Sequence, residues 1–334
     1  MVKTIAIVTP VLDDWLSFAG LMTDVAQQYA GSDFAFHVYA VDDGSVEPFD
    51  AADIALPRGS CIGSVEIIRL AANLGHQRAI AIGLCAVAER GEADTVVVMD
   101  SDGQDRPLDI AALLAASRRQ PRHVVFAGRA KRSESGTFRV CYGLYRLLFY
   151  ALTGEAINFG NFCAMPMAAV RRLVYMSELW NHLAASVMRS RLPYLSVPTV
   201  RGSRRAGRSQ MNLIALIIHG LSAMSVYADK IFIRVLLAAG LIAGIAGFGI
   251  AVVAAIRIAT DLAIPGWATA TIGDLLIILL QTLVIVIAAS LTVLAARSSR
   301  PIVPIVDCRC FVAEREGCQL GPRQAVVAAV RSAA

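Results

Sequence analysis

The feature that most limits the fold of this chain is a short apolar run that ends abruptly in acidic residues and glycine. The run Thr95–Met99 leads directly into Asp100-Ser101-Asp102-Gly103-Gln104-Asp105. A short run rich in β-branched residues that ends in this way is typical of a buried strand followed by a polar loop. Open α/β sheets bind their ligands at the carboxyl ends of such strands. The sequence therefore predicts a ligand site immediately after this strand.

Apolar runs of this kind alternate with helical patterns along residues 1–129. Strands are expected over residues 4–8, 34–41, 65–70, 94–99 and 124–127. Helices are expected between them, over residues 73–90, over residues 107–119, and from Asp13 and Asp14 to Tyr29 with Leu16, Leu21, Val25 and Ala26 on one face. Strands and helices that alternate so regularly predict a parallel sheet with helices on both faces.

A second acidic turn, Asp42-Asp43-Gly44-Ser45, follows the second of these strands. A simple Asp-Gly turn is the alternative, but two acidic turns at one sheet edge favour a shared nucleotide site. After the third strand, Asn73 and His76 are candidates for contact with ribose or phosphate. For these two residues a helix-capping asparagine and a surface histidine are the alternative.

The acidic loop after the strand 94–99 offers oxygen ligands for a divalent cation. Asp100, Asp102 and Gln104 are the candidate ligands. Proteins usually hold Mg²⁺ or Mn²⁺ by one or two carboxylates together with substrate phosphates. We therefore expect an ion that bridges the diphosphate of a nucleotide-sugar, and a solvated acidic turn that caps the next helix is the alternative.

Two later stretches are long and apolar enough to cross a membrane. Residues 231–256 carry one charge, Arg234, and residues 272–296 carry only Asp274. Each exceeds the ~20 residues needed to span the hydrocarbon core. Charged residues make up 17% of the whole chain, against about 25% in soluble proteins, so two buried helices of a soluble protein are a poor alternative. Small residues in the first span permit close packing, including packing between copies of the chain: Gly240, Gly244, Gly247 and Gly249.

Two further apolar segments are predicted to lie at the membrane interface. Residues 129–150 combine arginines with an apolar, aromatic face, which suits an interfacial helix, and an ordinary helix packed on the domain is the alternative. Residues 213–227 are apolar but too short to span a bilayer comfortably. By the positive-inside rule, the flanking cations place both termini and the first domain in the cytoplasm; these cations are Lys230, Arg234, Arg297 and Arg300.

We therefore expect four segments: a cytosolic catalytic domain (1–210), a juxtamembrane interfacial helix (211–229), a two-helix transmembrane domain (230–296) and a cytoplasmic tail (297–334) without an assigned function. The cysteines are scattered as in reduced cytosolic proteins. Cys308, Cys310 and Cys318 resemble a partial metal site, but without a fourth Cys or His nearby they favour incidental cysteines. No stretch resembles a nucleic-acid-binding motif.

Taken together, several motifs resemble those of glycosyltransferase family 2. The resemblance is to the polyprenyl-phosphate glycosyltransferases, which include dolichol-phosphate mannose synthase and undecaprenyl-phosphate glucosyltransferases, and it extends over about residues 1–296. It is carried by Thr9-Pro10-Val11, Asp42-Asp43-Gly44-Ser45, Asn73-Leu74-Gly75-His76-Gln77, Asp100-Ser101-Asp102-Gly103-Gln104-Asp105, Asn161-Phe162 and Arg204–Ser209. This resemblance implies an α/β catalytic domain of the GT-A (Rossmann-like) type, followed by interfacial helices and two transmembrane helices.

The resemblance also implies a role for individual residues. Nucleotide-sugar binding would fall to Pro10, Asp42, Asp43, Asn73, His76, Asp100 and Asn161. The acceptor phosphate would be bound by Arg129, Arg139, Arg204 and Ser209. The catalytic residues would be Asp100, Asp102, Arg129 and Arg205, and the metal ligands Asp100, Asp102 and Gln104.

The chain departs from the family pattern at three places. Leu12-Asp13-Asp14 stands where Tyr-Asn-Glu is usual, Asn161-Phe162 where Asp-Phe is frequent, and Ser209-Gln210-Met211 where Ser-Lys-Tyr is frequent. Loss of that lysine leaves Arg205 or Arg208 as the cation that neutralises the leaving diphosphate.

The expected reaction is inverting transfer of a sugar from a nucleotide-sugar, UDP-glucose or another UDP-hexose, to a polyprenyl phosphate at the cytoplasmic face of a bacterial inner membrane. The expected partners are the donor, the lipid acceptor, the bilayer and a flippase. A family 2 enzyme with another acceptor is one alternative, although the chain lacks the Gln-x-x-Arg-Trp motif and further spans of polysaccharide synthases. A non-catalytic, membrane-tethered nucleotide-sugar-binding protein is the other alternative.

Overall fold

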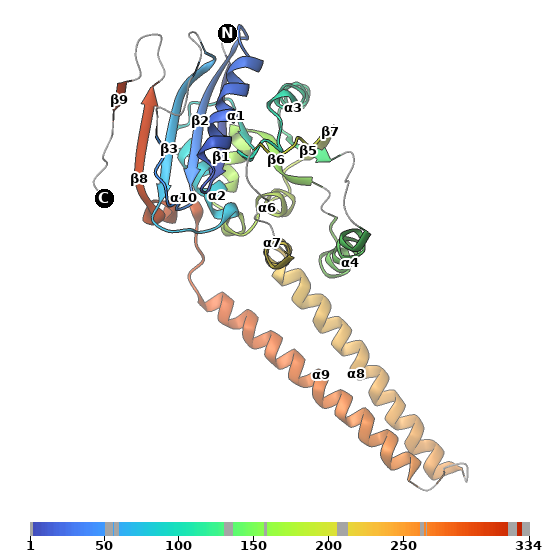
Figure 1. The fold of residues 1–334 in the computed structure, drawn as a ribbon. Helices are drawn as coiled ribbons and strands as arrows, with labels where there is room; N and C mark the ends of the chain where they lie inside the picture. Colours follow the sequence, from blue (N-terminus) through green and yellow to red (C-terminus); the bar gives the residue numbers. More distant parts are fainter. Residues whose placement is uncertain are drawn as a thin grey trace. The chain divides into compact units, whose positions relative to one another are not determined.

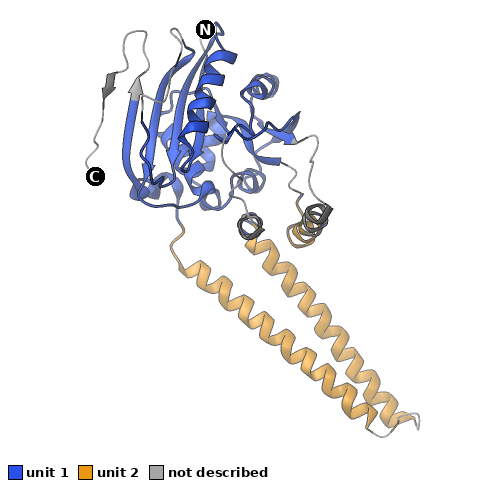
Figure 2. Ribbon diagram, viewed as in Figure 1, with its two compact units in different colours: residues 1–143, 156–226, 302–334 blue, residues 144–155, 227–301 orange. Residues whose placement is uncertain are grey.

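The computed structural model describes residues 3–50, 56, 60–129, 136–156, 159–205, 213–260, 264, 266–319 and 326–328. The chain forms two compact units, which Figure 2 shows in different colours. The first unit comprises residues 1–143, 156–226 and 302–334, and the second comprises residues 144–155 and 227–301.

The first unit is built on one mixed sheet, in which the described strands follow the order β7-β5-β6-β4-β1-β2-β3-β8-β9 (Figure 1). The strands are β1 (Lys3–Val11), β2 (Phe34–Asp42), β3 (Ile62–Leu70), β4 (Thr95–Val98), β5 (Val124–Arg129), β6 (Phe159–Pro166), β7 (Tyr194–Thr199), β8 (Val312–Gln319) and β9 (Val326–Ala328). β1 pairs in parallel with β2 and β4, and β2 pairs in parallel with β3. β6 is antiparallel to β4 and β5, and β8 is antiparallel to β3 and β9.

Helices cover both faces of this sheet and enclose two apolar cores. Alternate residues of a strand point to opposite faces, so Ile5 and Ile7 of β1 join one core while Ala6 and Val8 join the other. The core around Ile5 and Ile7 includes α1 (Trp15–Gln28) and α3 (Pro107–Arg119). The other core includes α2 (His76–Arg90), α5 (Met167–Leu173), the 3₁₀ helix η2 (Ser177–Trp180) and α6 (Leu183–Arg189).

The five strands predicted from the sequence are all present, with ends shifted by up to three residues. These five strands run parallel to one another, as predicted, because β4 and β5 are both antiparallel to β6. The sheet as a whole is mixed, because β6 and β8, which were not predicted, run antiparallel to their neighbours. The placement of Leu16 with the buried face of α1 was wrong, since Leu16 is 76% exposed. Trp15, Phe18, Leu21 and Val25 form the buried face at the spacing of helical turns, and Leu16 lies one position off that face.

The C-terminal segment, which the sequence analysis separated from the catalytic domain, is part of the first unit. It contains α10 (Pro304–Asp307), the 3₁₀ helix η3 (Cys308–Phe311) and β8. Cys308 is fully buried in the core that includes α2, and the ring of Phe311 lies 5.0 Å from that of Trp180. Arg309 and Arg315 both pair with Glu89 of α2. This segment therefore completes the edge of the sheet next to β3.

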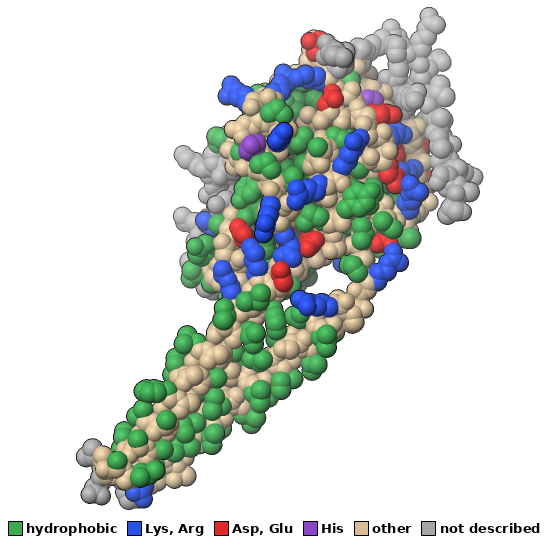
Figure 3. Space-filling model, turned by 180° about the vertical axis from the view of Figure 1, so that it is seen from behind, with side chains coloured by type: hydrophobic (Ala, Val, Ile, Leu, Met, Phe, Trp, Pro, Cys, Tyr) green, Lys and Arg blue, Asp and Glu red, His purple; other side chains and the backbone are tan. Residues whose placement is uncertain are grey.

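The second unit contains two long apolar helices, α8 (Ala228–Ala259) and α9 (Trp267–Ser298). Both are long and apolar enough to cross a membrane, and side chains are mostly exposed along them. Figure 3 shows hydrophobic side chains over most of their surface. Of the four glycines in α8, only Gly249 lies against α9, where an added Cβ would approach Leu275 to 3.1 Å; nothing lies within 4 Å at the other three.

The end of α4 (Gly136–Thr153) is fastened to the beginning of α8 within this second unit. The Arg234 guanidinium donates to the carbonyl oxygens of Tyr150 and Ala151, at 3.2 and 2.5 Å. Lys230 donates to Glu155 at 2.9 Å. The last carbonyls of a helix have no partners within the helix, so Arg234 satisfies the C-terminus of α4. Leu147, Leu148 and Tyr150 remain exposed on α4. The short α7 (Leu213–Ser225) belongs to the first unit.

The cysteines agree with a reduced protein. Cys61, Cys85, Cys163, Cys308 and Cys310 are free thiols in the described part of the chain. Cys308 is buried whereas Cys310 is exposed. The side chains of Cys141 and Cys318 lie outside the described residues.

Candidate active site

The candidate site lies where the strand order reverses. The chain passes from β1 to β2 and β3 on one side, and then returns to place β4 on the other side of β1. The helices that follow β1 and β4 lie on the same face, whereas α2, which follows β3, lies on the opposite face. Ligands of open α/β sheets bind beyond the carboxyl ends of strands at such a switch point. The acidic turns after β2 and β4 and the start of α2 all follow carboxyl ends at this edge.

The loop after β4 is a tight turn held by its own acidic side chains. The backbone N–H of Asp100 donates to Asp105 Oδ2 at 2.9 Å, and the N–H of Gln104 donates to Asp102 Oδ1 at 2.9 Å. Gly103 has a φ of +86°, a conformation that glycine adopts without steric cost. The Ser101 hydroxyl donates to the carbonyl of Pro10 at 3.3 Å. The loop is thereby fixed to the end of β1.

The two acidic residues at the end of β2, Asp42 and Asp43, are buried and accept hydrogen bonds from the neighbouring backbone. Asp42 Oδ1 accepts the N–H of Ser45 at 2.8 Å. The Asp43 carboxylate accepts the N–H groups of Leu74 and Gly75 at 2.7 and 2.9 Å. Burial raises the pKa of Asp43, and these two N–H groups offset part of the rise. Asp43 therefore holds the start of α2 against β2. Asn73, expected as a contact or a cap, is exposed, and α2 begins at His76 after Gly75.

Three residues that the sequence analysis selected from separate motifs meet beside the loop after β4. His76 Nε2 lies 3.3 Å from Asp100 Oδ1 and 3.1 Å from the amide nitrogen of Asn161. Asp100 Oδ1 and Asn161 Oδ1 are buried atoms without a hydrogen-bond partner among the described residues. A buried polar atom without a partner is costly. These two oxygens therefore indicate a position where a bound group would supply the missing interaction.

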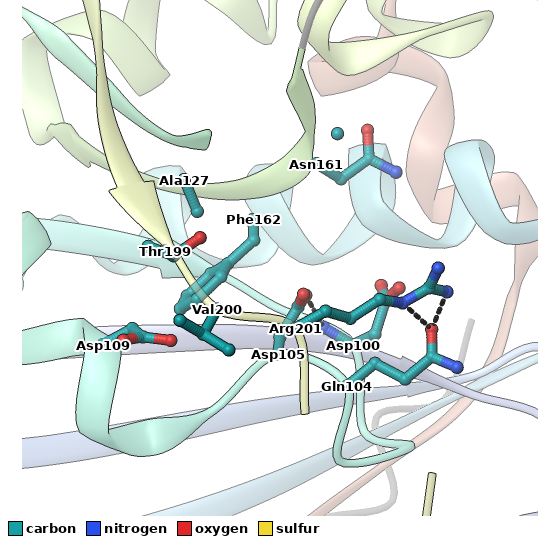
Figure 4. A pocket seen from close by; sticks show the side chains of 11 residues that line it. Asp100, Gln104, Asp105, Asp109, Ala127, Asn161, Phe162, Thr199, Val200 and Arg201 are labelled. Carbon is teal, nitrogen blue, oxygen red and sulfur yellow. Dashed lines mark hydrogen bonds between the residues drawn. The ribbon is translucent and has the colours of Figure 1, made fainter. Parts of the chain in front are cut away.

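A basic segment lies across the loop after β4; we define it as residues 201–205. The N–H of Gly202 donates to the carbonyl of Gln104 at 2.8 Å, and the N–H of Arg205 donates to the carbonyl of Asp102 at 3.1 Å. The Arg201 guanidinium donates to Gln104 Oε1, with Nε at 2.9 Å. Figure 4 shows Arg201 extended over Gln104, beside Asp100 and Asp105. The basic segment and the acidic loop thus form one hydrogen-bonded structure.

The charges of this arrangement act on the pKa of Asp102. Burial raises the pKa of Asp102, and the negative charge of Asp100 raises it further. The N–H of Gln104 and the positive charges of Arg204 and Arg201 lower the same pKa. The proximity of two carboxylates costs free energy when both are ionised. A site with this charge distribution favours an additional cation between them.

A pocket opens beside the basic segment and the acidic loop. Figure 4 shows its lining, in which Asp100, Gln104 and Asp105 come from the loop after β4. Asn161 and Phe162 come from β6, and Thr199, Val200 and Arg201 follow from β7 into the basic segment; Asp109, Ala127 and Gly160 complete the lining. The pocket therefore joins the acidic loop to strands that the sequence analysis did not predict.

The structure brings most of the predicted site residues to this edge, with exceptions. Arg129 is the last residue of β5 and Arg139 lies in α4, but their side chains, like Ser209, lie outside the described residues. The amide oxygen of Gln104, a predicted metal ligand, accepts hydrogen bonds from Arg201. Sequence reasoning missed Arg201 and Asp105 as site residues. Arg201 is the first residue of the basic stretch, and this position was the only feature of the sequence that indicated a role for it.

The residues present fit a divalent cation at two of the three predicted ligands. Asp100 offers a buried oxygen without a hydrogen-bond partner among the described residues, and Asp102 is a second carboxylate close to it. One or two carboxylates are the usual protein contribution to an Mg²⁺ site completed by phosphates. The described residues contain no group of three His, Cys, Asp or Glu side chains arranged for a metal, so substrate oxygens would have to complete the coordination.

The α/β domain, its acidic site at the switch point of the sheet and the two long apolar helices are the features that any classification of this protein has to explain. The model of the family described as Glycosyl transferase family 2 matches residues 6–179, more than half of the chain. The chain therefore belongs to glycosyltransferase family 2.

Curated relatives within this family are distant. An undecaprenyl-phosphate 4-deoxy-4-formamido-L-arabinose transferase of Sodalis glossinidius is 27% identical over 225 residues, which span 65% of this chain and 65% of the relative. The corresponding transferase of Erwinia tasmaniensis is 26% identical over 227 residues, again 65% of each chain. The chain thus covers just under two thirds of the length of these relatives.

Solved structures of similar fold include glucosyl-3-phosphoglycerate synthase from Mycobacterium tuberculosis in complex with Mn²⁺, UDP-glucose and phosphoglyceric acid. Its TM-score is 0.47 and its sequence identity is 16%, over 69% of this chain and 80% of that chain.

Proposed function

We propose that this protein transfers a sugar from a nucleotide-sugar to a polyprenyl phosphate at the cytoplasmic face of a membrane. The observation that carries the proposal is the buried Oδ1 of Asp100, which has no hydrogen-bond partner among the described residues and lies close to Asp102 and the basic segment. This arrangement suits a metal-bound diphosphate. Family membership and the distant similarity to undecaprenyl-phosphate transferases support the same reaction class.

On the donor side, charge complementarity supports a nucleoside diphosphate sugar, which we propose to be UDP-glucose or another UDP-hexose. Expulsion of the nucleoside diphosphate builds negative charge on the leaving oxygen. A bound Mg²⁺ or Mn²⁺ would offset this charge. Asp100 and Asp102 would hold the cation, and Arg201 and Arg204 are the nearby cations that the chain itself supplies. Pro10, Asp42, Asp43, His76 and Asn161 would shape the nucleotide and sugar sites.

On the acceptor side, a lipid phosphate explains why the site needs no general base. The second pKa of a phosphate monoester is about 6, so the acceptor is mostly a dianion at neutral pH. Its oxygen can attack the anomeric carbon without losing a proton. Arginines are the preferred partners of phosphate, and we propose Arg129, Arg139, Arg204 and Ser209 for this role. Direct displacement inverts the anomeric centre, so an α-linked donor gives a β-linked lipid-phosphate sugar.

The two apolar helices support an acceptor that resides in the bilayer. α8 and α9 each contain 32 residues and are apolar enough to span a membrane. By the positive-inside rule, Lys230 and Arg234 at one end and Arg297 and Arg300 at the other support a cytoplasmic position for both ends of this pair. We propose the same side for the catalytic unit, with a flippase acting on the product.

The proposal is tested by a transfer assay with the full-length protein in membranes. The membranes receive undecaprenyl phosphate, Mn²⁺ or Mg²⁺, and one labelled UDP- or GDP-sugar at a time, and the label in the organic phase is measured. We expect a metal-dependent lipid product from one donor that the Asp102→Ala variant does not form. Elongation of a polymer would support a family 2 enzyme with another acceptor. Nucleotide binding without any transfer would support the non-catalytic alternative.

A further inference from the structure

Arg205 is engaged by α1, although sequence reasoning placed it in the catalytic machinery. Its guanidinium forms an ion pair with Asp24. Gly20 precedes Asp24 by one helical turn, and residues four apart share one face of a helix. A Cβ at Gly20 would lie 2.6 Å from Nη1 of Arg205. The absence of a side chain at Gly20 therefore leaves the space in which the guanidinium reaches Asp24.

Arg205 also crosses the acidic loop on its way to α1. A Cβ at Gly103 would lie 2.9 Å from Cγ of Arg205, so the stem of the arginine passes directly over this glycine. The backbone N–H of Arg205 donates to the carbonyl of Asp102 in the same loop. Arg205 thus connects the basic segment both to the acidic loop and to α1.

Arg204, the neighbouring arginine, makes a second contact at the beginning of α1. Arg204 Nη2 lies 3.7 Å from Oδ2 of Asp14, and Oδ1 of Asp14 caps α1 by accepting the N–H of Ser17. α1 therefore holds the basic segment at two points, Asp14 and Asp24. Asp14 also caps the helix, whereas the carboxylate of Asp24 lies inside it.

We propose that Asp24 is a positioning residue, which through Arg205 holds the basic segment across the acidic loop and so keeps Arg201 and Arg204 facing Asp102. The charges of Arg204 and Arg201 both act on Asp102, whereas the guanidinium of Arg205 is held at α1. Asp24 would therefore control nucleotide diphosphate affinity without contacting the nucleotide. The affinity part of this inference rests on the proposed function, and the anchoring part does not.

The size of the effect follows from the exposure of the pair. The side chains of Arg205 and Asp24 are 33% and 40% exposed, and ion pairs of this kind contribute little. Loss of the pair should therefore weaken UDP binding by about two- to fivefold. It should raise hydrogen exchange of the Gly202 and Arg205 amides by a similar factor.

The experiment uses the full chain in detergent or nanodiscs and two variants that release Arg205 by different routes. Asp24→Ala removes the carboxylate, and Gly20→Ala fills the space beside it with a change that itself favours helix. Hydrogen exchange of peptides covering residues 201–205 and calorimetric titration with UDP are measured. Both variants should speed exchange and weaken UDP binding, with exchange in the rest of α1 unchanged. Asp24→Glu should restore both values.

Asp33→Ala is the matched control, since it removes an exposed aspartate of the same unit outside the site. It should change neither value. Unchanged exchange of the basic segment in both Asp24→Ala and Gly20→Ala would overturn the anchoring role. Faster exchange with unchanged UDP affinity would overturn the control of affinity. If the wild type binds neither UDP nor GDP, the proposed function fails while the exchange measurement still decides the anchoring role.

Discussion

His76 Nε2 lies 3.3 Å from Oδ1 of Asp100, at the carboxyl edge where the strand order reverses. The same ring nitrogen accepts the amide hydrogen of Asn161 in the arrangement described above. A nitrogen that accepts from Asn161 cannot also donate to Asp100. This competition explains why Oδ1 of Asp100 is buried without a hydrogen-bond partner among the described residues.

Replacement of this carboxylate is expected to abolish most of the activity. Asp100→Asn keeps the size of the side chain but removes the negative charge that would hold the cation. We expect the rate of sugar transfer to fall about 100-fold or more, the order of loss when one electrostatic group is removed from an active site. Mn²⁺ binding, measured by electron paramagnetic resonance, should weaken in parallel. Normal Mn²⁺ binding by Asp100→Asn would exclude Asp100 as a ligand.

Two glycines with positive φ allow the stability cost of backbone strain to be measured separately from that of a steric clash. Gly44 and Gly31 both have positive φ, at +82° and +70°, but a Cβ at Gly44 would lie 2.9 Å from the backbone nitrogen of Asn73, whereas nothing lies within 4 Å of one at Gly31. Gly31→Ala should lower the free energy of unfolding by about 1–2 kcal/mol through the left-handed conformation alone. Gly44→Ala should cost clearly more, because backbone must move. Equal losses in chemical denaturation would contradict the role of this contact.

Asp43 should give the stability a pH dependence of defined sign. Burial raises its pKa above the ordinary 3.8. A carboxyl with a higher pKa in the folded state contributes stability that is fully present below the unfolded value and is lost as the pH rises through the folded value. Wild type should therefore gain stability relative to Asp43→Asn as the pH falls from 7 towards about 4. Denaturation curves at several pH values measure this difference, and a constant difference would contradict the prediction.

The end of α4 should depend on Arg234. Arg234→Leu removes the donors to the carbonyls of Tyr150 and Ala151 and leaves an apolar side chain. Hydrogen exchange at residues 150–153 should accelerate about tenfold, as expected for ~1.4 kcal/mol of lost hydrogen bonding. Arg257→Leu, in the last turn of α8, is the matched control and should leave these amides unchanged. Equal exchange in both variants would show that α4 is held by other contacts.

The C-terminal segment should be required for the stability of the first unit. A chain that stops at residue 301 loses Cys308 from the core and uncovers β3 along its pairing with β8. We expect this truncation to aggregate or to unfold at a much lower denaturant concentration. Arg309→Ala should leave the free energy of unfolding nearly unchanged, because Arg309 is 74% exposed in its pair with Glu89. Wild-type stability of the truncated chain would contradict this role.

Local pattern was enough to predict the parallel centre of the sheet. Each of β1–β5 is an apolar run that stops at a polar turn, and that information lies within a few residues. β6 was missed although Phe162–Met165 is a short apolar run, and β8 was missed because it has no such run. β8 contains Glu314, Arg315 and Glu316, and it is a strand only because the edge of β3 offers hydrogen bonds to a segment far away in the sequence. Tertiary context decides such strands.

In the candidate site, too, some residues could be predicted from a local sequence pattern and others depend on contacts between distant segments. Acidic and glycine-rich turns identified Asp42, Asp43, Asp100 and Asp102, because turns of this kind have a sequence signature. The partners of these residues could not be predicted in the same way. Asp24 lies within an ordinary amphipathic helix, and its relation to Arg205 depends on how α1 and the basic segment meet in space. Contacts between distant segments leave no periodic pattern in the chain.

The position of β8 beyond α9 has a consequence for biosynthesis. Ribosomes make both apolar helices before residues 312–319 emerge, so the edge of the sheet beside β3 stays unpaired until both helices have been synthesised. Exposed strand edges recruit other chains, and nascent domains fold from the N-terminus as they appear. The sheet of the first unit is therefore completed only after α8 and α9 have been made.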